Sequence, residues 1–530
     1  VQEYIYHKGM YLREPEFKPI LRAKAIAFEN ASGRDHAVLD ELGNTVLYGH
    51  PDAQSILTRI QVENDRLLLL RNTVEGERPA GFVSYREIGN EDLFGVLKDM
   101  ELANLVRGKS SREILLITGI YAREDGTGDS GVIRDAPQQL LVEVLAKELE
   151  KNYSFALFVA ERGTATKEVV YVLERQGFIR PHMADENDKR TIYMVDMHEP
   201  LMFLHNLDTT IKEPFASNPA VLDAVEKNHK KLQIAMTKLY PGNLVLSLSS
   251  GIMYHRLVDR ITALNDVPRE PLVPRRLGKN MCVPFGKILR GKVVPNTVTK
   301  TLHTDKVYEP DLNSFTIEPF PYYSPLKSQI ETIKSFDRPV ILVDDLVHTA
   351  NRLQVLVPQL REDGIPIKKV VVGVLSGYGR DLMQCLKVPV ESIYSMPNLR
   401  QWFVESTLYP FIGGDTVRRE EMKVAGLQPS INMILPYATP RLSGCSREAL
   451  VEFSACCIEN SRDLFQVLEA EYRKMYAKNL TLSRLSEAVI LPLCPDKGSC
   501  MEYDENLAAS VYLENDLETL WRMKEFLIKG

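Results

Sequence analysis

The chain has 530 residues, of which 44% are hydrophobic and 26% are charged, and its formal net charge is −6. That length exceeds one ordinary hydrophobic core, so roughly two to four domains are expected. The charge balance gives no reason to expect a nucleic-acid-binding or membrane-surface protein, and no apolar run approaches the ~20 residues of a membrane span. The seven cysteines include no CxxC spacing and the first residues show no signal-peptide pattern, so free thiols and a cytoplasmic protein are expected.

The first 55 residues have a mixed pattern that predicts no definite element. From residue 56 to 205 apolar strands and helices alternate. The expected strands are 66–72, 80–88, 114–122, 155–160 and 191–197, with helices over 137–151 and 165–176. Residues 209–219 then form a linker into a helix over 220–240.

A second alternating region begins with the strand 243–251. Its further elements are a helix at 253–265, a Pro-rich basic stretch of little periodicity at 267–328, a strand at 339–345, a helix at 350–362 and a strand at 368–377. Beyond residue 436 the pattern is helical, as in 447–476 and 516–528. Cys456 and Cys457 lie in the first of these helices and are expected to be reduced and at least partly buried. Continuous apolar strands separated by helices predict parallel sheets covered on both faces.

The stretch PVILVDDLVHTANRL (339–353) places two carboxylates, Asp344 and Asp345, at the end of an apolar strand. Adjacent carboxylates repel each other, and burying either one costs several kcal/mol unless a cation or hydrogen-bond donor meets it. A solvated strand end is one interpretation. Ligand binding is the other, because ligands of α/β sheets bind at the carboxyl ends of the strands.

The order strand, Asp-Asp, turn with Thr, helix resembles the phosphoribosyl-diphosphate signature of type I phosphoribosyltransferases. The resemblance implies that Asp344 and Asp345 hold the ribose and, indirectly, a Mg²⁺ ion. It also implies that the following turn binds the 5′-phosphate, because a turn that opens a helix directs free amides at an anion. The residues expected there are Leu346, Val347, His348, Thr349, Ala350 and Arg352.

This site departs from the family pattern at two positions. Ala350 stands where the family usually has Gly, which would add about 1–2 kcal/mol if that position needs a positive φ. Arg352 replaces the usual Thr or Ser, and it either reinforces phosphate binding or lies solvated on the helix. Ser249, Ser250 and Gly251 follow the earlier strand, where the family has its diphosphate loop. The basic stretch 279–306 would cover the diphosphate or form a solvated loop.

In the first region the strand 114–122 runs into REDGTG (123–128), which fits the Q/R-x-x-G-x-G/A pyrophosphate loop of GNAT acetyltransferases. The resemblance implies that Arg123, Gly126 and Gly128 bind acetyl-CoA or another acyl-CoA. It also implies a mixed, largely antiparallel sheet with a splayed V for the pantetheine arm. Residues 129–135 separate the glycines from the next helix, unlike the family. The family's general-acid tyrosine falls at Leu173.

The two resemblances divide the chain into an uncertain segment 1–55, a GNAT-like domain 56–205, a phosphoribosyltransferase-like domain 206–435 and a helical region 436–530. They predict an α/β multidomain enzyme that transfers phosphoribosyl groups with Mg²⁺ and binds an acyl-CoA. Its partner would be a small nucleotide or sugar phosphate. The sequence allows a homo-oligomer but does not establish the oligomeric state. One alternative is a nucleotide- and CoA-sensing regulator without turnover. The other is an N-acetyltransferase whose C-terminal half is a scaffold.

Overall fold

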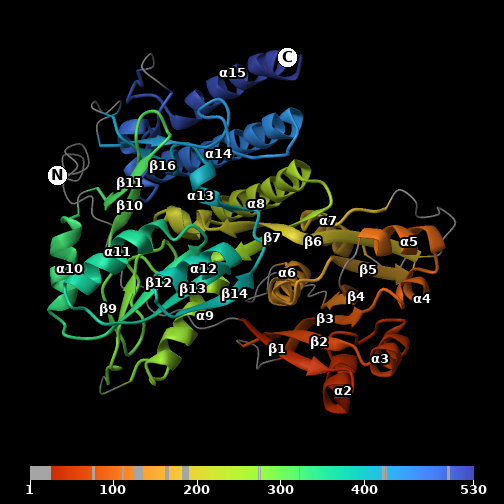
Figure 1. Cartoon of the computed structure of the whole chain (residues 1–530). Coiled ribbons are helices and arrows are strands. Elements are labelled where there is room, and N and C mark those ends of the chain that lie inside the picture. Colours follow the sequence, from red (N-terminus) through yellow and green to blue (C-terminus); the bar gives the residue numbers. More distant parts are fainter. Residues whose placement is uncertain are drawn as a thin grey trace.

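The structure is a computed structural model of the whole chain (Figure 1). It describes residues 26–73, 78–109, 113–123, 135–161, 166–181, 190–272, 274, 276–321, 323–419, 424, 426–497 and 502–529. Within these residues the strands form one sheet of eight strands and two of five. The chain is therefore a mixed α/β protein of several units with a helical C-terminal region, as the sequence predicts.

The first sheet begins at residue 26 and includes part of the segment left uncertain by the sequence. Its elements are β1 (Ile26–Ser32), α2 (His36–Asn44), α3 (Ala53–Val62), β2 (Arg66–Asn72), β3 (Arg78–Ile88), α4 (Leu93–Leu97), α5 (Met100–Lys109), β4 (Ile114–Ala122), α6 (Ala136–Glu148), η1 (Leu149–Lys151), β5 (Phe155–Glu161), α7 (Lys167–Arg175) and β6 (Arg190–His205). Neighbours from β1 to β6 are antiparallel except β4 and β5, which are parallel. This strand order and direction is a GNAT-like fold, and the expected mixed, largely antiparallel sheet is confirmed.

Strand β2 explains how the sheet is covered. Its four consecutive leucines, Leu67 to Leu70, are all fully buried. Leu67 and Leu69 pack with residues of α2 and α3, whereas Leu68 and Leu70 pack with residues of α6 on the opposite face. Because successive side chains of a strand point to opposite faces, a continuous apolar run requires helices on both sides.

Strand β6 continues beyond the GNAT-like part and joins the two halves of the chain. Its second half pairs in parallel with β7 (Asn243–Ser249) and with β15 (Gln401–Val404). The sequence places 243–251 with the second sheet, and this is wrong. The reason is that β5 begins opposite Asp196 and runs back along the first half of β6, which leaves both edges of the apolar run 201–204 available to other strands.

The second sheet is parallel throughout and has the order β14-β13-β12-β8-β9. Its strands are β8 (Met281–Pro284), β9 (Val298–Thr299), β12 (Val340–Val347), β13 (Ile367–Ser376) and β14 (Val390–Met396). The helices around it are α9 (Ser250–Leu264), α10 (Leu326–Lys334), α11 (Asn351–Glu362) and α12 (Gly377–Cys385). One hydrophobic core runs from Leu68 of the first sheet to Val343 and Val371 of the second. The expected parallel sheet of apolar strands is present.

A third sheet and the C-terminal helices complete the chain. The sheet contains β10 (Thr304–Tyr308), β11 (Phe315–Pro319), β16 (Asp415–Val417), β17 (Gln428–Ile431) and β18 (Leu493–Pro495). The helices are α8 (Pro219–Leu239), α13 (Glu405–Leu408), α14 (Arg447–Tyr476) and α15 (Ala509–Lys529), with short turns η2 (Leu207–Thr210), η3 (Phe215–Ser217) and η4 (Leu482–Glu487). The predicted helix 447–476 coincides with α14. The Pro-rich stretch contains β8 to β11, which are too short to produce a periodic pattern.

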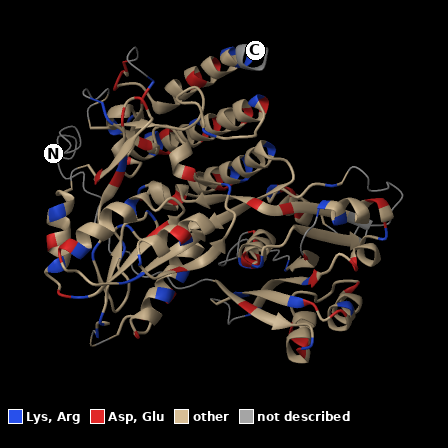
Figure 2. Cartoon of the chain, in the orientation of Figure 1, with Lys and Arg blue, Asp and Glu red and all other residues tan. Residues whose placement is uncertain are grey.

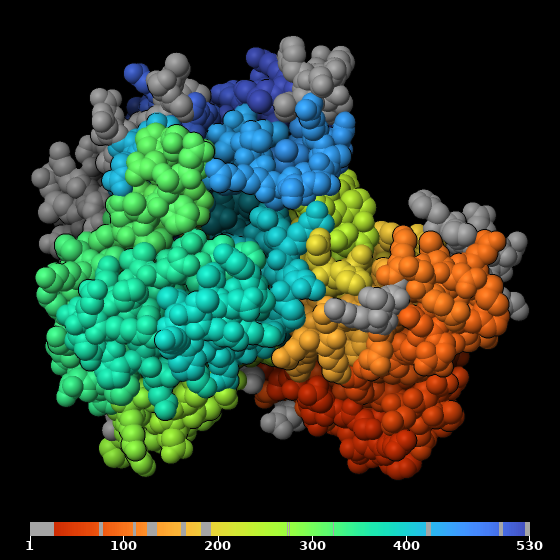
Figure 3. All heavy atoms as spheres, in the orientation of Figure 1, coloured from red at the N-terminus to blue at the C-terminus, as the bar shows by residue number. Residues whose placement is uncertain are grey.

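The outer surface and the cysteines agree with the composition. Acidic and basic residues are interspersed along the ribbon (Figure 2). The space-filling view shows the red-to-orange N-terminal region beside the cyan region, with yellow residues between them (Figure 3). The cysteines of the described residues are free, with Cys457 buried and Cys456 partly buried, as predicted. Among the described helices, none combines the length and apolarity that crossing a bilayer requires.

Candidate functional site

Strands β4 and β5 separate towards their carboxyl ends. They pair in parallel only between residues 115–117 of β4 and 156–158 of β5. Beyond that point β5 continues beside β6, while residues 118–122 of β4 keep β3 as their neighbour. Beyond residue 117 the second edge of β4 therefore has no strand partner among the described residues, and this divergence of the two strands is here called the β4–β5 wedge. This divergence agrees with the splayed V expected from the sequence, and its use by a pantetheine arm stays a prediction.

A β-bulge at Thr118 lies where the wedge begins. Ser84 of β3 is opposite Gly119 and Tyr85 is opposite Ile117, which leaves Thr118 as the extra residue of β4. A bulge interrupts the ladder and turns the strand, and bulges are common beside active sites. It redirects the backbone of β4 at the point where β5 leaves it.

Side chains from α3, from β3 and from the turn before β2 hold this bulge. The Thr118 hydroxyl donates to Asp65 Oδ2 at 2.6 Å and lies 2.7 Å from Ser84 Oγ. Arg59 of α3 donates to the Thr118 carbonyl oxygen at 3.0 Å. Asp65 is fully buried and its second oxygen accepts from Arg86 at 2.8 Å, so its charge is compensated. Nothing in the spacing of these residues along the sequence indicates this group.

The expected pyrophosphate loop falls partly beyond the part of the chain that the structure describes. Gly126 and Gly128 lie outside the described residues, whereas the Arg123 amide donates to the Ala80 carbonyl at 2.9 Å. Helix α6 begins after Asp135, whose carboxylate accepts from Arg175 at 2.6 Å and makes no capping hydrogen bond. Among the described residues, therefore, no side chain caps the first turn of α6.

No tyrosine of α7 takes the place of the family's general acid. Leu173, at the matching position, is fully buried in the core. Tyr171 is 41% exposed and its ring lies under the guanidinium of Arg175, on the side facing α8.

The carboxylate pair lies near the end of β12, and the chain itself satisfies most of it. Asp345 accepts the amide of Lys287 at 2.7 Å with one oxygen and the amide of Ile288 at 2.9 Å with the other. Asp344 Oδ1 accepts the Asp345 amide at 2.8 Å and lies 4.0 Å from Arg352 Nη1. A Cβ on Gly286 would come within 2.6 Å of an oxygen of each carboxylate, so this close approach requires glycine.

The two acids also differ in electrostatics from solvated strand-end residues. Burial raises the pKa of Asp344 to about 7, while the charge of Arg352 opposes this shift and that of Asp345 adds to it. Burial lowers the pKa of Lys287, and the neighbouring Arg290 lowers it further. The interpretation of a fully solvated strand end is therefore wrong for Asp344, which is 9% exposed.

The turn after the acids is shorter than expected. Leu346 and Val347 are still in β12 and pair with Val374 and Leu375, so only 348–350 form the turn. The reason is that β13 extends far enough to pair with both. Ala350 has φ 50°, the left-handed conformation in which the family's glycine is favoured.

The side chains of Thr349 and His348 in this turn already form hydrogen bonds with other side chains. Thr349 Oγ1 accepts from Asn351 at 2.8 Å, and His348 Nδ1 lies 2.9 Å from Ser376 Oγ. Helix α11 has no side-chain cap, so the turn still presents first-turn amides beside Arg352. An anion at this turn would meet those amides, and phosphate binding there stays a prediction.

Ser249, Ser250 and Gly251 lie elsewhere. They connect β7 of the first sheet to α9, where Ser249 Oγ accepts the Ile252 amide at 3.4 Å. The sequence groups them with Asp344 in one site, but their strand belongs to another sheet. They line a cavity of about 280 Å³ between α6, α8, β7 and α9, together with Arg175 and two histidines. No motif of the sequence marks those histidines.

Comparison with known proteins adds matches of backbone only. No family model matches the sequence, and no curated protein matches it. A putative GNAT acetyltransferase from Desulfovibrio desulfuricans aligns with 33% of this chain and 99% of its own, at 12% identity and a TM-score of 0.23. The catalytic domain of Tetrahymena GCN5 histone acetyltransferase with coenzyme A aligns with 33% of this chain and 96% of its own, at 10% identity and 0.23.

Arabidopsis thaliana NAA60 in complex with acetyl-CoA gives a similar match, covering 32% of this chain and 96% of its own at 13% identity and a TM-score of 0.23. At these values the matches carry no argument about chemistry. The GNAT-like fold of this chain rests on its own strand order, the parallel β4–β5 pair and the wedge.

Proposed function

We propose that the chain is an acyl-CoA-dependent N-acyltransferase whose acyl-CoA site is the β4–β5 wedge. The observation that carries this proposal is the coincidence of the bulge at Thr118 with the separation of β4 from β5. The unpaired edge of β4 offers backbone groups to the amide units of a pantetheine arm, in the manner of an added strand. In the GNAT family this is where the arm lies.

The residues around the bulge would fix the wedge before the ligand arrives. Thr118 is held by its hydroxyl through Asp65 and by its carbonyl through Arg59. Binding to a strand edge that is already ordered costs less conformational entropy than binding to one that must first become ordered. Arg123, Gly126 and Gly128 would bind the pyrophosphate, as the motif predicts, next to the uncapped first turn of α6. The reaction would move an acyl group from the thioester to an amine and release free CoA.

The test is calorimetry of acetyl-CoA with the purified chain, followed by release of free CoA thiol in the presence of small amines and peptide N-termini. Thr118→Val keeps the shape but removes the hydroxyl, and it should weaken acetyl-CoA binding roughly tenfold by loosening the bulge. Thr58→Val, whose hydroxyl bonds only within α3, is the matched control. Absence of acetyl-CoA binding to the wild type would remove the proposal.

A second candidate function is binding of phosphoribosyl diphosphate at the end of β12. It is supported by the left-handed Ala350, the uncapped α11 and Arg352 beside Asp344. Magnesium fits less well, because both oxygens of Asp345 already accept backbone amides and Asp344 has a raised pKa. We therefore assign the anion to the turn and Arg352, and no step to a metal there.

Calorimetry with phosphoribosyl diphosphate, with and without Mg²⁺, tests this second candidate. Arg352→Gln should weaken binding by about 1.5–3 kcal/mol, the range for a hydrogen bond to a charged group. Arg361→Gln on the same helix should not, since its guanidinium bonds the carbonyls of Leu386 and Lys387 away from the turn. Binding without release of diphosphate would favour a sensor over a transferase, and equal affinities of both variants would contradict the site.

A further inference from the structure

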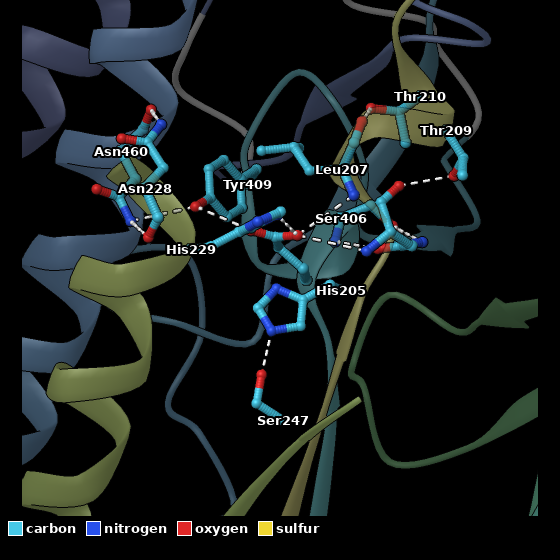
Figure 4. A network of polar contacts seen from close by, with 12 residues as sticks. His205, Leu207, Thr209, Thr210, Asn228, His229, Ser247, Ser406, Tyr409 and Asn460 are labelled. Carbon is cyan, nitrogen blue, oxygen red and sulfur yellow. Dashed lines mark hydrogen bonds and ion pairs between the residues drawn. The ribbon is translucent and has the colours of Figure 1, made fainter. Parts of the chain in front are cut away.

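Two histidines and a glutamate from distant parts of the chain meet beside the cavity of about 280 Å³. His205 is the last residue of β6, His229 lies in α8, and Glu405 opens α13. One potential ligand atom of each lies within 4.8 Å of those of the other two. Figure 4 shows His205 and His229 close together, with Ser247 on the side of the His205 ring that faces away from His229.

The hydrogen bonds of His205 leave one ring nitrogen available. Its Nε2 bonds the Ser247 hydroxyl, whereas its Nδ1 is buried and has no hydrogen-bond partner among the described residues. A buried polar atom without a partner is unfavourable, so such atoms call for an explanation. A metal-binding histidine has this arrangement, since one nitrogen coordinates while the other is oriented by a neighbouring polar group.

Glu405 supplies the anionic donor. Its side chain is fully buried and its ion-pair partner is His229, whose Nε2 lies 2.7 Å from Oε2. The amide of Leu207 donates to the same oxygen at 3.2 Å, and Tyr409 lies 3.5 Å from Oε1. Tyr409 is in turn held by Asn460 at 3.1 Å. The Leu207 amide and the Tyr409 hydroxyl thus hold the carboxylate in place, while its Oε2 atom contacts His229.

The surroundings also give the site an open side. His205 and His229 line the cavity, whereas Glu405 lies behind them and does not. Three protein ligands with a fourth position open to a cavity are typical of catalytic zinc sites, and two imidazoles with one carboxylate is a donor set that zinc accepts. We propose that His205, His229 and Glu405 bind a divalent transition-metal ion of the zinc type, with its free position facing this cavity.

The alternative is that His229 and Glu405 only form a hydrogen bond and bind no metal, which would leave the backbone the same. The test must therefore measure how much metal each chain binds. The full chain, without a histidine tag, is purified from zinc-supplemented medium and its metal content measured by mass spectrometry. We expect one zinc per chain, loss of that zinc in His205→Gln and His229→Gln, and retention in His198→Gln. His198 is the matched control because it is on the same strand and its partner is Asp196.

Cobalt substitution and thermal unfolding provide readouts that do not depend on the variants folding well. Chelated wild-type protein should develop the visible absorption bands of low-coordinate Co²⁺ on addition of cobalt, and should melt at a higher temperature when zinc is restored. Substoichiometric zinc together with no cobalt bands and no change in melting temperature would overturn the proposal. Zinc retained in full by both His205→Gln and His229→Gln would overturn it as well.

Discussion

The β4–β5 wedge and the end of β12 both lie at the carboxyl ends of strands, but they differ in what the chain has left unpaired. At the wedge, separation of two strands leaves an edge of β4 without a strand partner among the described residues. At the end of β12, the acids that stand out in the sequence already accept amides of their own chain. A motif therefore indicates where polar groups gather, whereas the hydrogen bonds decide which of them remain for a ligand.

The largest effect should follow from filling the space beside the acids. Gly286→Ala puts a Cβ within 2.6 Å of an oxygen of both Asp344 and Asp345, so the turn must move and its amides must leave Asp345. We expect a loss of about 3 kcal/mol in the free energy of unfolding, measured by urea titration. Gly108→Ala in α5, where a Cβ meets nothing within 4 Å, should be neutral or slightly stabilising. Equal stabilities would mean that the acids are not packed against this turn.

Replacement of Asp345 should have the second-largest effect on the free energy of unfolding. From the sequence, Asp345→Asn relieves repulsion between neighbouring carboxylates and should be tolerated. The hydrogen bonds reverse that expectation, because the amide group of Asn would face a backbone amide donor and leave it unpaired. We expect a loss of about 1.5–3 kcal/mol in unfolding free energy. A change within experimental error would show that water replaces the lost acceptor.

At the wedge, Thr118→Val should cost about 1–3 kcal/mol, since it leaves Asp65 Oδ2 buried without its hydroxyl donor. Thermal unfolding of this variant beside Thr58→Val measures the difference. If acetyl-CoA affinity falls while stability does not, the bulge matters to the ligand alone. If stability falls and affinity is unchanged, the wedge is not the acyl-CoA site.

The smallest effect concerns pH. Asp344 has a pKa raised to about 7 from the usual 3.8, so its contribution to stability is complete below 3.8 and is lost as pH rises through 7. Asp344→Asn imitates the protonated acid and should gain on the wild type by roughly 1–2 kcal/mol between pH 6 and pH 8. Urea unfolding at both pH values measures this gain, with the exposed Asp381→Asn as control. A constant difference between wild type and Asp344→Asn would contradict the raised pKa.

The sequence predicted features whose signals are local. The apolar runs of β4 and β12, helix α14 and the turn at Ala350 follow from periodicity and motif, which involve neighbouring residues. The pairing of β7 with β6 could not be predicted, because an apolar strand fits either sheet equally well by pattern. The His205–His229–Glu405 group was also beyond reach, since His229 and Glu405 are 176 positions apart and each is unremarkable among its neighbours.

The shared strand β6 has a consequence for any attempt to work with half of the protein. A fragment that stops at His205 would contain every strand of the GNAT-like order, yet Leu201, Met202, Phe203 and Leu204, all buried in the whole chain, would lose both neighbouring strands. Such a bare apolar edge recruits other copies and aggregates. A shorter chain that keeps both edges of this run covered would have to extend as far as residue 404, so the GNAT-like unit cannot be cut away at His205 without exposing it.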